Sequence, residues 1–315
     1  MDGNGSNLSL LASNTESLFT NCQDALCLFI AALYFLTMAL ILVLNSVCLV
    51  VLRRVRGIQD TTKLFMMSLT LSDFCIGIFC GIPSLYYFIS TSMALSGAFC
   101  EIIVAYLLLT LITINAVSMV LLTIDRFLAI TYTLHYPRLM TLKRSKVIIL
   151  LVWTLTITLY SALFCLSSKP SEDTKQFQCL RHHNIRNIFI SISGVSLGTI
   201  LTLYAYILKV ARRQARLIAS QNTIGNIEGR QNVPGPISTK SATTVIIITG
   251  TACLCWIPFT ILASFSSKDL MMPFSIKIIA LTLYCTKSWL NCIIYYWRNR
   301  EFKQALQNFR LSCCH

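Results

Sequence analysis

Hydrophobic positions in this chain fall into seven long runs, separated by charged or turn-rich segments. A helix needs about 20 mostly apolar residues to cross the ~30 Å hydrocarbon core of a bilayer, and each run has that length. The pattern therefore predicts an all-α membrane protein, a seven-transmembrane helix bundle. The predicted spans are residues 24–52, 62–89, 98–130, 147–166, 188–210, 242–265 and 274–297.

Composition agrees with lipid as the solvent. Hydrophobic residues make up 55% and charged residues 12% of the 315 residues, and the mean hydropathy of +0.68 does not fit a soluble protein. The sequence has no repeat of fixed period and no inverted repeat with paired broken helices, which argues against the common transporter architectures. We expect an extracellular tail at 1–23, the bundle at 24–297, and an amphipathic helix with a cytoplasmic tail at 298–315.

The net charge of +14 comes from 26 Lys and Arg residues against 12 Asp and Glu residues. The cations lie mainly after spans 1, 3, 5 and 7, so basic loops alternate with loops that are poor in cations. By the positive-inside rule, the N-terminus is extracellular and the C-terminus cytoplasmic, as in a multi-pass plasma-membrane protein. The basic balance therefore reflects topology and contact with anionic membrane lipid, and we expect no nucleic-acid partner.

The first 23 residues are polar and lack the cationic and apolar regions of a cleavable signal peptide. We therefore expect the first span to act as the signal anchor. Asn4 and Asn7 each begin an N-x-Ser sequon, which an extracellular tail would expose to glycosylation.

The cytoplasmic end is amphipathic. Residues 298–311 place Phe302, Leu306 and Phe309 on one helical face and cations elsewhere, which predicts a helix lying at the membrane surface. Cys313 and Cys314 follow as candidate palmitoylation sites, with two unmodified thiols as the alternative.

Charged side chains inside the spans are costly in lipid, so each is a candidate functional residue. Asp73 lies in the middle of the second span, and Lys287 lies within the seventh. Asp125 and Arg126 form an adjacent pair at the cytoplasmic end of the third.

Short motifs surround these charges and occur in a fixed order along the chain. They are Asn45, Leu69-Thr70-Leu71-Ser72-Asp73, Asp125-Arg126-Phe127, Trp153, Cys255-Trp256-Ile257-Pro258 and Asn291-Cys292-Ile293-Ile294-Tyr295. With these motifs, the chain resembles the rhodopsin-like (class A) G protein-coupled receptors from the first span to the cytoplasmic tail. The loop at 134–141 is similar to that of the melanocortin, adenosine and cannabinoid receptors.

The resemblance implies a two-state switch. A carboxylate beside a cation at the cytoplasmic end can hold that cation in an inactive bundle and release it to a partner protein in an active one. Pro258 kinks its helix, so a small rotation near Trp256 becomes a larger cytoplasmic displacement. A snorkelling arginine at 126 and a proline needed only for packing are the alternatives. The residues implied in the switch and in G-protein coupling are Asp125, Arg126, Trp256, Pro258, Asn291, Tyr295 and Tyr204.

Several positions depart from the family pattern. Phe127 replaces the usual Tyr, and Cys292 stands where the seventh span usually has a proline. No acid lies near Ser238 and Lys240 at the start of the sixth span, so a salt bridge from Arg126 to that span is not expected. The restraint on the inactive state is then expected to be weaker than in members that have the bridge.

Lys287 occupies a position where the family usually has a neutral polar residue near the aspartate of the second span. An unpaired lysine in mid-bilayer costs roughly 3 kcal/mol or more, which favours a partner. We hypothesise that Lys287 pairs with Asp73 and substitutes for the sodium ion that many relatives bind there. Asn45 and Asn115 complete the predicted interior polar cluster. The alternative is that Lys287 faces an aqueous ligand cavity.

The extracellular half carries fewer family features. The resemblance implies a disulfide between Cys100 and Cys179, which an oxidising exterior permits, with two free thiols as the alternative. The third span has no Asp where amine receptors carry one, which argues against a biogenic amine. Cys285 replaces the retinal-binding lysine of opsins, which argues against light sensing. Basic residues near the top of the bundle could attract an acidic or phosphorylated ligand, with an ordinary solvated loop as the alternative. The predicted pocket residues are Tyr106, Leu109, Arg181, His182 and Lys277.

We therefore predict a G protein-coupled receptor, with an extracellular ligand and a heterotrimeric G protein as partners. The solvent-facing segments contain no nucleotide-binding loop, zinc motif or nucleophile with a base, so we expect no enzyme activity, cofactor or metal. Two alternatives remain. One is an ion or solute transporter or channel that uses Asp73 and Lys287 as a relay, and the other is a non-signalling receptor-like partner in receptor oligomers.

Overall fold

The computed structural model of the chain describes residues 25–89, 97–167, 183–224, 250–251, 254–262, 264 and 274–313. Regular structure in these ranges is entirely helical, and six helical segments are long and apolar enough to cross a membrane. Residues 254–262 are also helical and belong to the predicted sixth span, whose first part, 242–249, lies outside the described ranges. The helical membrane bundle predicted from the hydrophobic runs is confirmed.

The observed boundaries lie close to the predicted spans at most ends. The second span is made of three consecutive segments, and the fifth is longer than predicted, with 42 residues. The elements are α2 (Ala25–Arg54), α3 (Asp60–Ile76), η1 (Gly77–Gly81), α4 (Ile82–Ile89), α5 (Gly97–Thr131), α6 (Tyr136–Leu139), α7 (Leu142–Ser167), α8 (His183–Ile224), α10 (Phe274–Arg298) and α11 (Arg300–Cys313).

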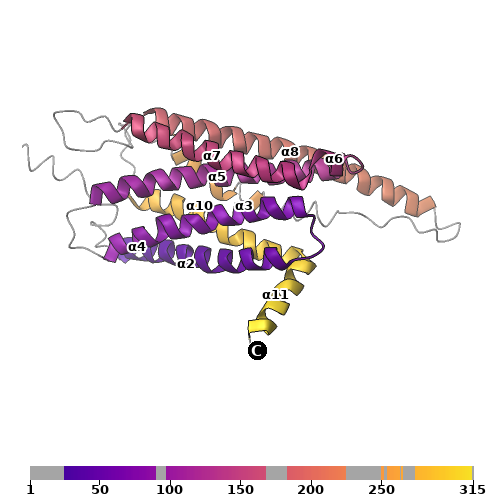
Figure 1. Ribbon diagram of the computed structural model, residues 1–315, viewed down its shortest axis with the longest axis horizontal. Helices are drawn as coiled ribbons and strands as arrows, with labels where there is room; N and C mark the ends of the chain where they lie inside the picture. The colour runs from indigo at the N-terminus through magenta and orange to yellow at the C-terminus, as the bar shows by residue number, and fades with distance from the viewer. Residues whose placement is uncertain are drawn as a thin grey trace, which may run out of the picture.

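The long helices lie side by side along one axis (Figure 1). Helix α5 packs against α3, α7 and α8, and α2 packs against α3 and α10. Helix α11 leaves the end of α10 and runs across the bundle axis. This direction is the one expected of a helix that lies at the membrane surface.

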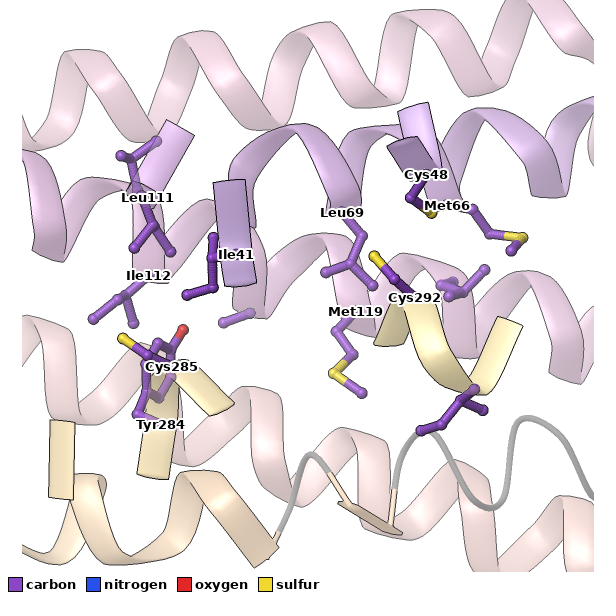
Figure 2. Packing of buried hydrophobic residues seen from close by; sticks show 14 of the residues in the cluster. Ile41, Cys48, Met66, Leu69, Leu111, Ile112, Met119, Tyr284, Cys285 and Cys292 are labelled. Atoms are coloured by element: carbon purple, nitrogen blue, oxygen red, sulfur yellow. The ribbon is translucent and has the colours of Figure 1, made fainter. Parts of the chain in front are cut away.

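The core is formed by side chains of α2, α3, α5 and α10. Figure 2 shows Ile41, Leu69, Ile112 and Tyr284 among the side chains that meet inside the bundle, and each is at most 1% exposed. Helix α7, by contrast, presents large apolar side chains outward, with Leu155 65% exposed. Apolar side chains on the outside of a bundle are expected where lipid is the solvent.

A π-helical turn interrupts the second span at η1, which the sequence analysis did not predict. Such turns insert an extra residue and shift the faces of the helix that follows. A Cβ atom at Gly77 would lie 2.7 Å from Cδ2 of Leu42, so α2 approaches this turn where residue 77 has no side chain.

Helix α11 begins where its sequence supplies a cap. The side-chain oxygen of Asn299 accepts hydrogen bonds from the backbone N–H groups of Glu301, at 3.0 Å, and Phe302, at 3.2 Å. Asparagine is a favoured N-cap because it satisfies donors that the first turn leaves unpaired. Phe302 is only 3% exposed and anchors the helix against the bundle. The short amphipathic helix predicted after the seventh span is confirmed.

Candidate functional site

A buried carboxylate connects three elements at the end of the bundle that the charge pattern predicts to be cytoplasmic. Asp125 is fully buried, and its Oδ2 accepts hydrogen bonds from Arg126 Nη2, at 2.9 Å, and Nε, at 3.2 Å. Thr62 of α3 donates to the same oxygen at 2.7 Å, and Tyr136 of α6 donates to Oδ1 at 2.5 Å. A buried charge requires such donors, because removing one partner leaves it uncompensated. The carboxylate thus joins α3, α5 and the loop that contains α6.

Tyr136 is the loop residue in this network. Its hydroxyl lies 2.7 Å from Thr61 Oγ1 as well as near Asp125. Burial and the hydrogen bond to Asp125 raise the pKa of Tyr136, so the phenol keeps its proton and remains a donor. Sequence reasoning missed Thr61, Thr62 and Tyr136, because their roles depend on how the loop folds back onto α3.

The Arg126 guanidinium pairs with the carboxylate of the preceding residue, Asp125. Its Nη2 lies 2.9 Å from Asp125 Oδ2, and its side chain is 15% exposed. The next residue, Phe127, packs edge-on against Tyr206 of α8, with ring centroids 5.3 Å apart. The start of the sixth span, where a family salt bridge would end, lies outside the described residues.

A second polar cluster lies in the middle of the bundle. Asp73 and Asn115 are fully buried, and Lys287 is 1% exposed. Asn115 Nδ2 donates to Asp73 Oδ1 at 2.7 Å, while its Oδ1 accepts a hydrogen bond from Lys287 Nζ. One amide of α5 therefore contacts the carboxylate of α3 and the ammonium of α10. Ser288 and Asn291 of α10 also lie around the Asp73 carboxylate.

The Lys287 ammonium also lies over two aromatic rings. Its Nζ is 4.4 Å from the ring centroid of Tyr284 and 5.1 Å from that of Trp256. A desolvated cation–π contact of this kind contributes about 2 kcal/mol. The two rings meet edge-on at 6.5 Å. Lys287 therefore couples the interior polar cluster to the tryptophan of the sixth span.

Asn45, the fourth residue of the predicted interior cluster, connects α2 to α10. Its Nδ2 donates to the Ile41 carbonyl at 2.9 Å, and its Oδ1 accepts a hydrogen bond from the Cys292 thiol at 3.4 Å. Cys292, the residue in place of the family's proline, thus bonds α10 to α2. A cysteine retains the backbone N–H that proline lacks.

Three further predicted switch residues occupy separate places. Tyr295 is 2% exposed, and its ring centroid lies 6.2 Å from that of Phe302 in α11. Tyr204 lies in the cytoplasmic half of α8, and Pro258 lies in the helical stretch 254–262. The contact between Tyr204 and Tyr295 in an active state stays a prediction.

Three aromatic rings pack together, among the described residues, in the half of the bundle that is predicted to be extracellular. Phe259 lies between Phe189 of α8 and Tyr284 of α10, with ring centroids 6.1 Å and 5.2 Å away. Tyr106, predicted to line the pocket, has its hydroxyl 2.6 Å from Ser161 Oγ of α7. Leu109 packs at the edge of the core. The pocket roles of Tyr106 and Leu109 stay predictions.

Several predicted positions lie outside the residues, or the side chains, that the structure describes. These are the cysteines proposed for the disulfide and for palmitoylation, the glycosylation sites and the basic residues near the ligand cavity: Cys100, Cys179, Cys313, Cys314, Asn4, Asn7, Arg181, His182 and Lys277.

Comparison with known proteins matches the chain to a receptor family and to individual receptors. Residues 44–295 match the family described as 7 transmembrane receptor (rhodopsin family). The histamine H2 receptor of Canis lupus familiaris is 27% identical over 271 residues, which cover 80% of this chain and 71% of that receptor. The histamine H2 receptor of Homo sapiens is 26% identical over 311 residues, covering 94% and 81%. The alpha-1A adrenergic receptor of Rattus norvegicus is 26% identical over 294 residues, covering 82% and 62%. These identities do not resolve a subfamily.

Proposed function

Since the chain belongs to the rhodopsin family of seven-transmembrane receptors, we propose that it binds an extracellular ligand and activates a heterotrimeric G protein by rearranging its helices. It is a multi-pass membrane receptor and not an enzyme. We place it in the plasma membrane with its N-terminus outside, because its basic residues gather in the loops on one side.

The observation that carries this proposal is the pair of Asp125 and Arg126. The guanidinium is held by a buried carboxylate at the end of the bundle where the basic loops lie. Separation of the pair would present a cation to a partner protein, while Thr62 and Tyr136 would still donate hydrogen bonds to the buried Asp125 carboxylate. The family match favours this receptor function over a transporter or channel.

A cell-based measurement tests the proposal without a known ligand. Ligand-independent activation of each class of Gα subunit is compared between the wild-type receptor and Arg126→Ala at equal surface expression. We expect basal activation of at least one class to fall to background in Arg126→Ala. Lys146→Ala, which also removes one exposed cytoplasmic cation, should retain it. Equal signals from wild type and Arg126→Ala in every class would contradict the proposal and favour a non-signalling partner.

We also propose that the Lys287 ammonium acts as the resident cation of the interior cluster. It supplies one positive charge opposite Asp73, and Asn115 contacts both groups. Its contacts with Tyr284 and Trp256 would favour the ring positions of the resting state. In relatives where this position is neutral, a sodium ion can supply that charge, so we expect this receptor to be insensitive to sodium.

The ligand is proposed not to be a biogenic amine, although the relatives include histamine and adrenergic receptors. Between Tyr106 and Ile112 the third span has only apolar residues and Thr110, so no carboxylate there can pair with an ammonium group. The aromatic rings of Phe189, Phe259 and Tyr284 suit a ligand with aromatic or apolar groups. Histamine and noradrenaline should fail to change G-protein activation, and a saturable response to either would contradict this.

A further inference from the structure

A cavity of about 360 Å³ opens between the cytoplasmic end of α2 and the side of α11. Its size lies at the lower end of the roughly 300–1,000 Å³ that small-molecule sites occupy. Two positive side chains enter it from the α2 side, and polar and aromatic side chains enter it from α11. The charged, amide and aromatic side chains that line the cavity belong to Arg54, Arg56, Glu301, Gln304, Asn308 and Phe309.

The Arg54 guanidinium is held in place by an aromatic ring. Its Cζ lies 5.0 Å from the ring centroid of Phe309. Stacking on a ring occupies the face of the guanidinium and leaves its N–H edge able to donate to an anion. In the described part of the chain, neither Arg54 nor Arg56 has a carboxylate within salt-bridge distance. The two cations are therefore not neutralised by a neighbouring ion pair.

The cavity is expected to lie at the depth of lipid headgroups, because it opens where the first span ends. Arg54 ends the first span, and α11 runs across the bundle axis from the same end (Figure 1). Phe302 and Leu306 turn the apolar side of α11 toward the bundle, as expected for a helix at the membrane interface. The cytoplasmic leaflet carries anionic lipid, so headgroup phosphates are abundant at this level.

Glu301 makes the lining more selective than a simple basic patch. Its carboxylate lies against Gly57, where an added Cβ would be 1.7 Å from Oε2. A carboxylate repels a phosphate but accepts hydrogen bonds from hydroxyl groups. Gln304 and Asn308 add amides that can both donate and accept. Cations beside these groups match a ligand that carries both phosphates and hydroxyls.

We propose that this cavity binds the headgroup of a phosphorylated polyol lipid of the inner leaflet. Arg54 and Arg56 donate to a phosphomonoester, which carries more negative charge than the phosphodiester of an ordinary phospholipid. Glu301, Gln304 and Asn308 face the hydroxyl groups of the polyol. The lipid would connect α2 to α11 without occupying the ligand cavity or the Arg126 site.

Binding of short-chain lipids to the purified full-length receptor tests this site. The probe is dioctanoyl phosphatidylinositol bisphosphate, compared with dioctanoyl phosphatidylserine and with soluble inositol trisphosphate, in neutral phosphatidylcholine nanodiscs. We expect the bisphosphate lipid to bind more tightly than phosphatidylserine. Arg54→Gln and Arg56→Gln should each weaken its binding by roughly three- to tenfold, as expected for a partly exposed charged hydrogen bond.

Two matched variants separate a built site from diffuse attraction. Arg53→Gln removes the same charge one residue away on α2 but not from the cavity lining, and should leave binding unchanged. Glu301→Gln should tighten binding, because it removes the acid that the described residues contribute to the lining. Equal losses in Arg53→Gln and Arg54→Gln, or equal binding of phosphatidylserine, would overturn the proposal. If inositol trisphosphate binds as tightly as the lipid and shows the same variant pattern, the polyol phosphate chemistry holds but its lipid source is wrong.

Discussion

Tyr136 donates a 2.5 Å hydrogen bond to the buried carboxylate of Asp125, so the loop after the third span is joined to the charge that holds Arg126. The sequence suggested a weak restraint on the inactive state, because the sixth span begins without an acid. Tyr136 can restrain the inactive state in another way, because its hydrogen bond joins the third span to the loop that follows it.

Tyr136→Phe should raise basal G-protein activation by roughly two- to fivefold, because a hydrogen bond to a charged group contributes about 1.5–3 kcal/mol and part of that would favour the resting state. The Asp125 carboxylate would lose the donor that orients it and joins it to the loop, so the resting arrangement of the pair would be less favoured. Basal signalling at equal surface expression measures the change.

Tyr132→Phe is the matched control for this change. It removes the same hydroxyl from the same loop, but Tyr132 is 48% exposed, and its ring packs edge-on against Phe127. Its basal signalling should equal that of wild type. A Tyr136→Phe receptor that signals like Tyr132→Phe would show that the loop does not restrain the switch.

Ser68→Ala should lower the stability of the bundle. Ser68 Oγ accepts a hydrogen bond from Trp153 Nε1 at 3.1 Å and lies 3.2 Å from Ser118 Oγ, so it joins α3, α7 and α5. Polar contacts between membrane helices contribute about 0.6 kcal/mol on average and up to about 1.7. The melting temperature of the purified receptor should fall measurably. Ser46→Ala should leave it unchanged, since the Ser46 hydroxyl bonds to the Leu42 carbonyl of its own helix. An equal fall in both variants would argue against the three-helix junction.

Gly57→Ala should displace α11. Gly57 has a φ of +99°, and an added Cβ would collide with the Glu301 carboxylate. Both effects disfavour alanine, by about 1 kcal/mol or more for the backbone alone. A spin label on α11 should report greater motion, and the melting temperature should fall. Gly194→Ala in α8 has open space around the added methyl and should be neutral or stabilising. An immobile α11 in Gly57→Ala would contradict the observed packing.

The fold was largely predictable, because a helix that crosses lipid must be long and mostly apolar. Runs of about 20 apolar residues predicted the helices, and the apolar face that contains Phe302 predicted α11. The Asn299 cap at the start of α11 was found only in the structure. The π-helical turn at η1 was not predictable. It depends on how closely α2 approaches Gly77, and no local pattern records that distance.

The candidate site was predictable where a residue is costly in lipid and therefore conspicuous. Asp73, Asp125, Arg126 and Lys287 stood out for this reason. Neutral donors such as Thr62 and Tyr136 were missed, because hydroxyl side chains are common in membrane helices and loops. Only the folded chain distinguishes those that meet a buried carboxylate.

If Lys287 supplies the cation of the interior cluster, replacing it should create a requirement for sodium. Without the ammonium, Asp73 would remain buried among Asn115, Ser288 and Asn291, a set of oxygen-bearing side chains suited to a hard cation. Lys287→Met combined with Asp73→Asn removes both charges and should abolish any such requirement. Lys287→Gln provides the same test if the methionine variant folds poorly.

The most direct measurement is the melting temperature of the purified receptor in sodium chloride and in N-methylglucamine chloride of equal ionic strength. We expect no difference for wild type and a rise of roughly 2 °C or more with sodium for Lys287→Met, since a ligand that binds only the folded state stabilises it. We also expect no difference for the double variant. Sodium-dependent stabilisation of the wild type, or none in both Lys287→Met and Lys287→Gln, would contradict the claim.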